Sequence, residues 1–221
     1  MSIINNYSLV IFDYDGTLCD TRGSIKFTMN KTFTNFNKAL PDQEKLEQLI
    51  GAGISLEETI QKLQTNGKLD DVSLKEWVVS YRKLYLLEGD QHTSLFDGVT
   101  ALFEHIKQRD IALVVVSNKG IKAIEKSLYH FKLNHYVQLV VGGDQNMKKK
   151  PHPMIYDEII KKQVKQSALK NVLMVGDTSA DIKFAQNCAI DHCWASYGYG
   201  DQDECQSLNP MYSINSISEL I

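Results

Sequence analysis

The stretch LVIFDYDGTLCD, Leu9–Asp20, sets four apolar residues directly before two aspartates that stand one residue apart. A short, continuous apolar run such as Leu9–Phe12 is typical of a strand that is buried on both faces of a parallel sheet. Asp13 and Asp15 therefore follow the carboxyl end of a predicted strand. In open parallel sheets ligands bind at this edge, so we expect both acids to lie at a ligand site.

Further strand-sized apolar runs alternate with helical patterns along the chain. The runs cover residues 111–116, 137–143, 171–176 and 192–196. Strands that alternate with helices are typical of a parallel sheet with helices on both faces. The sequence therefore predicts an α/β fold with a Rossmann-like parallel sheet core.

The segment of residues 20–90 contains no strand pattern. Its apolar residues over 25–40 recur at helical spacing and stop at Pro41. Ser55 and Ser73 each precede a glutamate by three residues, a capping-box pattern that predicts the start of a helix. We expect an all-helical domain inserted into the core. The predicted boundaries are residues 1–19 with 91–221 for the core, and 20–90 for the insertion.

The composition of the chain excludes several classes of protein. Its 221 residues are 43% hydrophobic and 23% charged, with a net charge of -3, which is ordinary for a soluble globular protein and gives no basic face for a nucleic acid polymer. No apolar run approaches the roughly 20 residues needed to cross a bilayer, and the first residues lack the pattern of a secretory signal. We therefore expect a cytoplasmic protein with no membrane partner.

Four polar motifs stand just after predicted strands or in the loops that leave them. They are DYDGT (13–17), SNK (117–119), KKPHP (149–153) and GDTSAD (176–181). Because the carboxyl ends of parallel strands meet at one edge of a sheet, these motifs can converge on a single site.

Taken together and in this order, the motifs resemble those of the haloacid dehalogenase superfamily of phosphohydrolases. DYDGT is similar to the first motif of that family, VVVSN to the second, the lysine of KPHP to the third and GDTSAD to the fourth. The resemblance spans residues 8 to about 188 and implies a haloacid dehalogenase-like fold. The insertion resembles the helical cap domain that some members carry after the first motif.

The resemblance assigns roles to the acids. A carboxylate is a competent nucleophile toward phosphorus, and Asp13 matches the residue that forms an aspartyl-phosphate. Asp15 matches the general acid/base that protonates the leaving group and then activates water. The family pattern holds Mg²⁺ with Asp13, the backbone carbonyl of Asp15, and Asp177. Asp181 is expected as a direct metal ligand or as a residue that supports one.

The resemblance also assigns the phosphate-binding groups. Ser117 and Asn118 match the second motif, where we expect the Ser117 hydroxyl and adjoining N–H groups at the start of a helix to bind the anion. Of three consecutive lysines only Lys150 stands directly before a proline, as in the family's pattern, and its point charge would neutralise the phosphoryl group.

Within the superfamily, Asp15 favours phosphoryl chemistry over dehalogenation. The loop of residues 49–60 has a Gly-Ala-Gly turn that looks like phosphoglycolate phosphatase-like enzymes, and it lacks the Lys or Arg that a sugar phosphomutase needs for a second phosphate. We expect hydrolysis of a small phosphorylated metabolite similar to phosphoglycolate. A nucleotide 5'-phosphatase, a pyrophosphatase, a sugar phosphomutase and a non-catalytic phosphate-binding module remain open, as does the oligomeric state.

Four residues are candidates for contact with the substrate: Thr17, Arg22, Gly51 and Gly53. Arg22 is the one that offers charge, and two interpretations of it stay open: a partner for a substrate carboxylate, or a solvated surface residue.

Overall fold

The computed structural model describes residues 2–65, 67–144 and 147–221. Within them, six parallel strands form a sheet in the order β5-β4-β1-β6-β7-β8. The strands are β1 (Leu9–Phe12), β4 (Ala112–Val116), β5 (Leu139–Val141), β6 (Val172–Gly176), β7 (Asp191–Ala195) and β8 (Tyr212–Ile214), and two short antiparallel strands, β2 (Cys19–Asp20) and β3 (Ser94–Leu95), lie outside this sheet.

Helices occupy most of the remaining chain. The α-helices are α1 (Arg22–Asn35), α2 (Gln43–Gly51), α3 (Leu56–Leu63), α4 (Asp71–Glu88), α5 (Val99–Gln108), α6 (Ile121–His130), α7 (Lys161–Gln163), α8 (Ser179–Cys188) and α9 (Gln202–Ser207). Shorter turns are the 3₁₀ helices Ile4–Asn6, Gly89–His92, Gln166–Leu169 and Ile217–Leu220, and a π-helical turn, Tyr156–Ile160.

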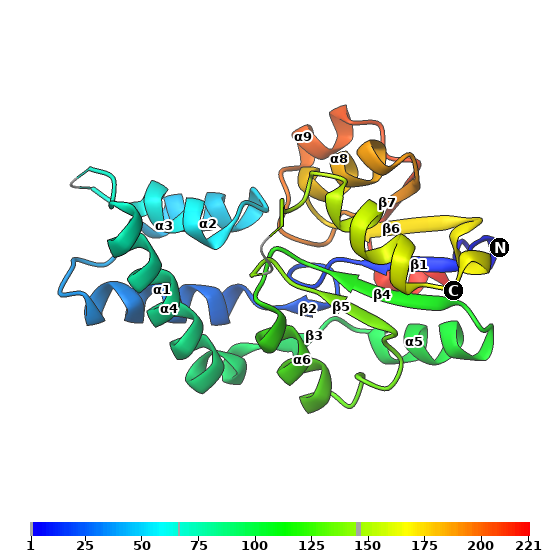
Figure 1. Ribbon diagram of the computed structural model, residues 1–221, viewed down its shortest axis with the longest axis horizontal. Helices are drawn as coiled ribbons and strands as arrows, with labels where there is room; N and C mark the ends of the chain where they lie inside the picture. Colours follow the sequence, from blue (N-terminus) through cyan, green and yellow to red (C-terminus); the bar gives the residue numbers. More distant parts are fainter. Residues whose placement is uncertain (1, 66, 145–146) are drawn as a thin grey trace.

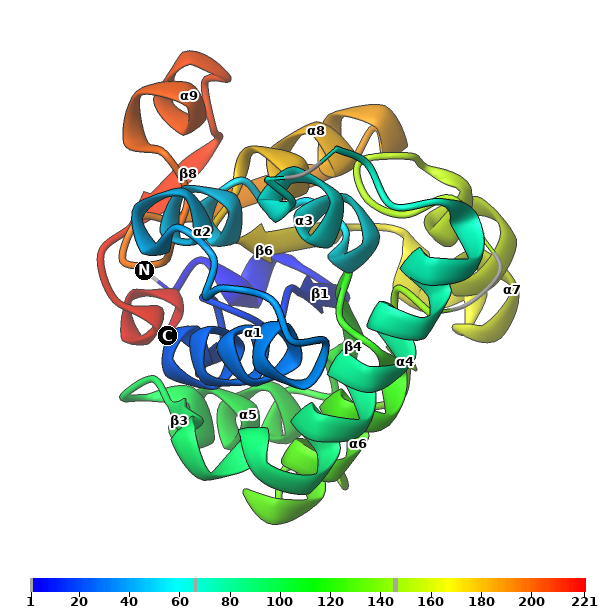
Figure 2. The same cartoon turned by 90° about the vertical axis from the view of Figure 1, so that its left-hand side faces the viewer.

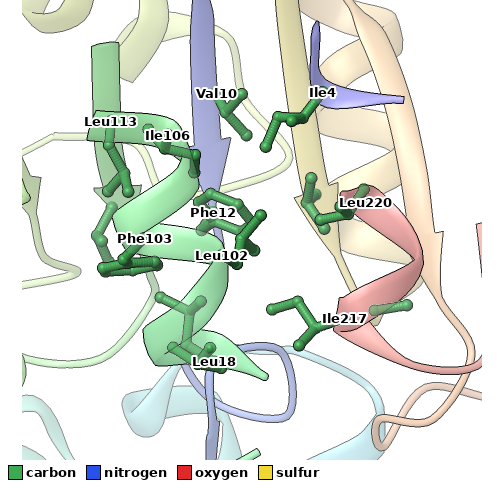
Figure 3. Packing of buried hydrophobic residues seen from close by; sticks show 14 of the residues in the cluster. Ile4, Val10, Phe12, Leu18, Leu102, Phe103, Ile106, Leu113, Ile217 and Leu220 are labelled. Atoms are coloured by element: carbon green, nitrogen blue, oxygen red, sulfur yellow. The ribbon is translucent and has the colours of Figure 1, made fainter. Parts of the chain in front are cut away.

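Strand β1 is buried on both sides because it lies between β4 and β6. Its alternate residues face opposite layers, as the pleat of a strand requires. Val10 and Phe12 pack against α5 and the last 3₁₀ turn (Figure 3), whereas Leu9 and Ile11 pack toward α8 and the π-helical turn. This two-sided burial explains the continuous apolar sequence of the strand.

Helices α1–α4 lie between β2 and β3 in the sequence, and we call them the helical insertion. They group beyond one end of the sheet, opposite the end where both termini lie (Figure 1). Seen from that side, they lie in front of β1, β4 and β6 (Figure 2). The insertion has an apolar core of its own around Met29, Phe33 and Trp77, and Ala123 of α6 joins this cluster.

The predicted fold class is confirmed, and five strands lie where the apolar runs predicted them. Ser55 caps α3 as expected, since its side chain accepts from the N–H of Glu58. The prediction at Ser73 was wrong, because Asp70 caps α4 and accepts from the N–H of Ser73. The first insertion helix ends at Asn35, well before Pro41.

Among the helices of the described residues, none combines the length and the apolar character that crossing a membrane requires.

The packing of the sheet against α5 gives a first prediction. Phe103 is fully buried, with its ring 5.9 Å from that of Phe12 and 6.0 Å from that of Tyr136. Phe103→Ala should lower the free energy of unfolding by about 3–5 kcal/mol, because a buried ring is lost and a cavity remains. Urea denaturation measures this, and Tyr129→Ala, at a residue 75% exposed, should change stability by less than about 0.5 kcal/mol. A similarly small loss of unfolding free energy for both variants would contradict the close packing of Phe103 between the sheet and α5.

Candidate active site

Three buried carboxylates meet at the carboxyl ends of β1 and β6. Asp13 follows β1, Asp177 follows β6, and Asp181 lies in the first turn of α8. Because β1 and β6 are parallel neighbours, their ends bring the three side chains together, and one oxygen of each lies within 4.8 Å of the others.

Lys150 lies within this acidic cluster. Its Nζ donates to Asp13 Oδ1 at 2.7 Å and to Asp181 Oδ1 at 2.6 Å, and its side chain is 3% exposed. Burial raises the pKa of Asp13 to about 7, with Lys150 opposing the shift and Asp181 adding to it. Burial, followed by repulsion from Asp13, raises the pKa of Asp177 well above its usual value. One ammonium therefore does not offset the negative charge that the cluster carries when ionised.

The carboxylate of Asp177 is fixed by neutral donors and by close backbone packing. Thr17 Oγ1 donates to its Oδ1 at 3.0 Å, and the N–H of Tyr199 donates to its Oδ2 at 2.8 Å. Gly16 has a φ of +81°, and a Cβ at this position would lie 2.2 Å from Asp177 Oδ2. The turn after β1 therefore needs glycine both for its backbone angle and for its contact with Asp177.

Asp181 has partners for both of its oxygens. Its Oδ2 accepts from the N–H of Thr178 at 3.0 Å and from Thr178 Oγ1 at 2.8 Å, which completes a capping box at the start of α8. Its Oδ1 accepts from Lys150. Asp181 thus links the start of a helix to the buried lysine.

Asp15 forms an ion pair that the sequence analysis missed. Lys119 Nζ donates to Asp15 Oδ1 at 2.9 Å, and the Lys119 side chain is only 9% exposed. Lys119 is the last residue of the SNK motif, so its place after β4 was the available signal. Its partner was not visible, because 104 residues separate the two.

Ser117 and Asn118 lie in the loop after β4, beside the acidic cluster. Ser117 is 3% exposed, and α6 begins only at Ile121, so the expectation that Ser117 stands at the helix start was wrong. Asn118 Nδ2 donates to the carbonyl oxygen of Gly53 at 3.0 Å and to that of Lys150 at 3.4 Å. Asn118 therefore bridges the helical insertion and the loop that carries Lys150.

A cavity of about 200 Å³ lies between these loops and the helical insertion, and we call it the chamber. Asp13, Asp15, Ser117, Asn118 and Lys150 line it on the side of the sheet. Most of the insertion's contribution is apolar, with Ile25, Met29, Leu49, Ile50, Ile54, Leu56, Tyr81, Tyr85 and Leu86. The chamber therefore joins a charged end to a largely apolar end.

Of the four residues predicted to contact the substrate, the structure places only some at the chamber. Gly53 lines the chamber, and a Cβ on Gly51 would lie 2.4 Å from the carbonyl oxygen of Tyr199. Thr17 is fully buried and bonds Asp177. Arg22 forms an ion pair with Glu47 and stacks 4.5 Å from the centre of the Tyr199 ring, and it is not among the described residues that line the chamber.

The contact of Gly16 with Asp177 gives a second prediction, with Gly67 as the matched control. Both glycines have positive φ angles, +81° and +93°, but a Cβ at Gly67 would meet nothing within 4 Å. Gly16→Ala should therefore lose about 1–3 kcal/mol more of its free energy of unfolding than Gly67→Ala, because only Gly16→Ala overpacks its surroundings. Chemical denaturation of both variants measures the difference. Equal losses of unfolding free energy would show that the contact between Gly16 and Asp177 does not affect stability.

Comparison with known proteins places this geometry in a family. The family model for haloacid dehalogenase-like hydrolases matches residues 10–195. The chain is similar to a phosphoglycolate phosphatase of Colwellia psychrerythraea, 24% identical with 96% of this chain and 95% of the relative covered. It is also similar to a pyrophosphatase, PpaX, of Oceanobacillus iheyensis, 26% identical with 96% and 94% covered.

Solved structures share the fold. A haloacid dehalogenase-like hydrolase from Bacteroides fragilis superposes with a TM-score of 0.86 at 22% identity, covering 97% of this chain and 100% of that one. A predicted phosphoglycolate phosphatase from Haemophilus somnus superposes with a TM-score of 0.83 at 22% identity, covering 98% and 97%. The chain is therefore an enzyme of the haloacid dehalogenase-like hydrolase family, as its four motifs predicted.

Proposed function

We propose that the protein is a Mg²⁺-dependent phosphatase that hydrolyses a small phosphate monoester through an aspartyl-phosphate on Asp13. The observation that carries the proposal is the chamber itself, where Asp13 and Asp15 face one cavity together with Ser117 and Lys150. A nucleophile, a proton donor and two phosphate-binding groups are thereby in reach of one bound phosphoryl group.

The acidic cluster fits a hard divalent cation. Carboxylate and carbonyl oxygens are the ligands that Mg²⁺ prefers. Burial is the main cause of the raised pKa values of Asp13 and Asp177, with repulsion from neighbouring acids adding to it, and a bound cation would favour the ionised form of both groups. We assign Asp13, the backbone carbonyl of Asp15, and Asp177 as ligands. Asp177 accepts one hydrogen bond from a neutral donor at each oxygen. Asp181, in contrast, pairs one oxygen with the Lys150 ammonium and accepts two hydrogen bonds from Thr178 at the other, which favours an orienting role for Asp181. When bound, the ion neutralises charge on the carboxylates and on the phosphate oxygens.

In the first half of the reaction, a carboxylate oxygen of Asp13 attacks phosphorus and the bond from phosphorus to the leaving oxygen breaks. The leaving alkoxide takes a proton from Asp15 and departs as an alcohol. Lys150, which contacts Asp13 at 2.7 Å, and the Ser117 hydroxyl hold the transferred phosphoryl oxygens during this step.

In the second half, Asp15 accepts a proton from water, and the water oxygen attacks phosphorus. The bond between phosphorus and the Asp13 oxygen breaks, which releases inorganic phosphate and restores both carboxyl groups. One difficult hydrolysis is thereby divided into two displacements with the same acid/base residue.

The lining of the chamber bears on the substrate. With pyrophosphate the leaving group is a second phosphate, which would bring more negative charge among apolar side chains than an alcohol or a single carboxylate does. An organic leaving group suits this lining better, so a phosphate monoester is favoured although relatives of both kinds exist. For a carboxylate such as that of phosphoglycolate, the candidate partners are Arg82 and Lys122, the cationic side chains among the described lining residues that do not pair with Asp13 or Asp15. We propose that the helical insertion acts as the cap that closes over this leaving group.

A phosphate-release screen tests the reaction. Wild-type protein with Mg²⁺ should release phosphate from phosphoglycolate or another small monoester, and Asp13→Asn should lose at least about 10³-fold of that rate, because the nucleophile is removed. Asp157→Asn is the matched control, since Asp157 is a solvent-exposed acid paired with Lys161 away from the chamber. It should retain the wild-type rate.

The same screen separates the alternatives. Full activity in Asp13→Asn would exclude Asp13 as the nucleophile. Faster release from nucleoside 5'-monophosphates or from pyrophosphate would move the substrate to those classes, and isomerisation of a sugar phosphate would indicate a mutase. Phosphate binding by folded protein without release from any compound would favour a binding module.

Metal binding should depend on pH. The pKa of Asp13 is raised to about 7, so below that pH the carboxyl group holds a proton that a metal ion must displace. The thermal stabilisation by Mg²⁺ should therefore be larger at about pH 8 than at about pH 5.5, and Mg²⁺ at about 100 times its Kd should add about 2.7 kcal/mol at the higher pH. Differential scanning fluorimetry measures the shift. Asp177→Asn should abolish it at both pH values, and a Mg²⁺ effect that survives this change would place the ion elsewhere.

A further inference from the structure

Lys119 is a buried cation to which the proposed reaction gives no task. It follows Ser117 and Asn118 in the loop after β4, and its ammonium group donates to Asp15 Oδ1 at 2.9 Å. Its side chain is 9% exposed, whereas that of Asp15 is 21% exposed. Removing an ammonium group from water is costly unless it is paired, so a buried lysine at this place calls for a specific explanation.

Two aromatic rings also lie near the Lys119 ammonium, one from the helical insertion and one from the core. Its Nζ lies 3.8 Å from the centre of the Tyr85 ring in α4 and 5.9 Å from that of Tyr14. A cation over an aromatic face is attracted by the negative charge of the ring face. Burial lowers the pKa of Lys119, but the opposing charge of Asp15 outweighs this and the net shift is upward, so the lysine stays charged.

Lys119 therefore joins the acid/base residue of the core to an aromatic ring of the insertion. Asp15 needs one orientation of its carboxyl group to exchange a proton with the leaving oxygen, and a free aspartate side chain samples several. The hydrogen bond from Lys119 to Oδ1 selects among these orientations before the substrate arrives and leaves Oδ2 to carry the proton that Asp15 donates, which is the kind of preorganisation that proton transfer needs. Tyr85 covers the ammonium only where α4 lies against this loop.

We propose that Lys119 is a positioning residue for Asp15, and that the ring of Tyr85 makes this positioning depend on the docked helical insertion. The inference rests on the proposed function for the role of Asp15. In this mechanism the insertion does more than enclose the leaving group, because its arrival completes the surroundings of the residue that protonates it.

Leaving groups that differ in their need for a proton provide the test. Nitrophenolate departs from p-nitrophenyl phosphate without protonation, whereas the alkoxide of ethyl phosphate requires it. Lys119→Met keeps the length of the side chain and removes the charge. It should lower the single-turnover rate of phosphoryl transfer from ethyl phosphate at least about tenfold more than that from p-nitrophenyl phosphate, because it disturbs the acid and leaves the nucleophile. The transfer rate is measured rather than kcat because hydrolysis of the aspartyl-phosphate uses Asp15 with both substrates. Lys119→Arg, which keeps the charge, should lose less.

Five further variants locate the effect. Asp15→Asn should show the same dependence on the leaving group. Adding Lys119→Met to Asp15→Asn should cause no further loss in the rate of transfer from ethyl phosphate, because the two residues act as a unit. Tyr85→Leu should reduce kcat for ethyl phosphate more than Tyr85→Phe, which keeps the ring. Lys170→Met, at an exposed lysine before β6, is the control for loss of charge and should match the wild type.

Three results would overturn the proposal. If Lys119→Met lowers the transfer rate equally for ethyl phosphate and p-nitrophenyl phosphate, Lys119 has a purely structural role. A rise in KM for phosphoglycolate alone, with kcat unchanged, would make Lys119 a direct partner of the substrate carboxylate. Additive losses in the double variant would show that Lys119 does not act through Asp15.

A stability measurement keeps the proposal testable if no monoester is hydrolysed, an outcome that would reject the proposed function alone. Thermal midpoints of Lys119→Met, Asp15→Asn and the double variant form a cycle. The ion pair predicts that the double variant is destabilised by less than the sum of the single variants. Additive midpoints would show that the two side chains do not interact, and the positioning role would fail.

Discussion

The burial of three carboxylates around one lysine is the constraint on which the rest of the site depends. Asp13 and Asp181 share the ammonium of Lys150, whereas Asp177 receives only neutral donors, from Thr17 and from the backbone of Tyr199. Burial raises the pKa of Asp13 and of Asp177, so ionising both is unfavourable without further positive charge. This deficit favours a cation at the cluster, and the cation in turn favours an anionic substrate beside it.

The positions of these carboxylates are fixed mainly by close contacts with the backbone of neighbouring loops. A Cβ on Gly16 or Gly198 would lie 2.2 Å from an atom of Asp177, and one on Gly176 would lie 2.3 Å from Asp181. Loops packed this closely leave each acid little room to move. Fixed charges of this kind need little rearrangement during reaction, which is the main way in which enzymes stabilise charged transition states.

Patterns within a short stretch of sequence could be predicted, and contacts between distant stretches could not. The strands before Asp13 and Asp177 were visible because both are apolar throughout, and parallel pairing then brings the two acids together. Strand β8, Tyr212–Ile214, is too short and too mixed in polarity to stand out. At α4, Asp70 and Ser73 were both suitable caps, and only the backbone decides between them. The pairing of Lys119 with Asp15 depends on how β1 and β4 align, which neither motif contains.

The insertion contacts the same loops that carry the motifs, and in the proposed function this links substrate recognition to chemistry. Asn118 donates to the carbonyl oxygen of Gly53, and Lys149 forms an ion pair with Glu57, so polar contacts hold the insertion at residues next to Ser117 and Lys150. Between these contacts the insertion presents mainly apolar side chains to the chamber. In the proposed function, a substitution that reshapes the apolar end for another leaving group should therefore also shift the loops proposed to hold the phosphoryl group. Specificity and rate are expected to change together in this fold, because one docking surface sets both.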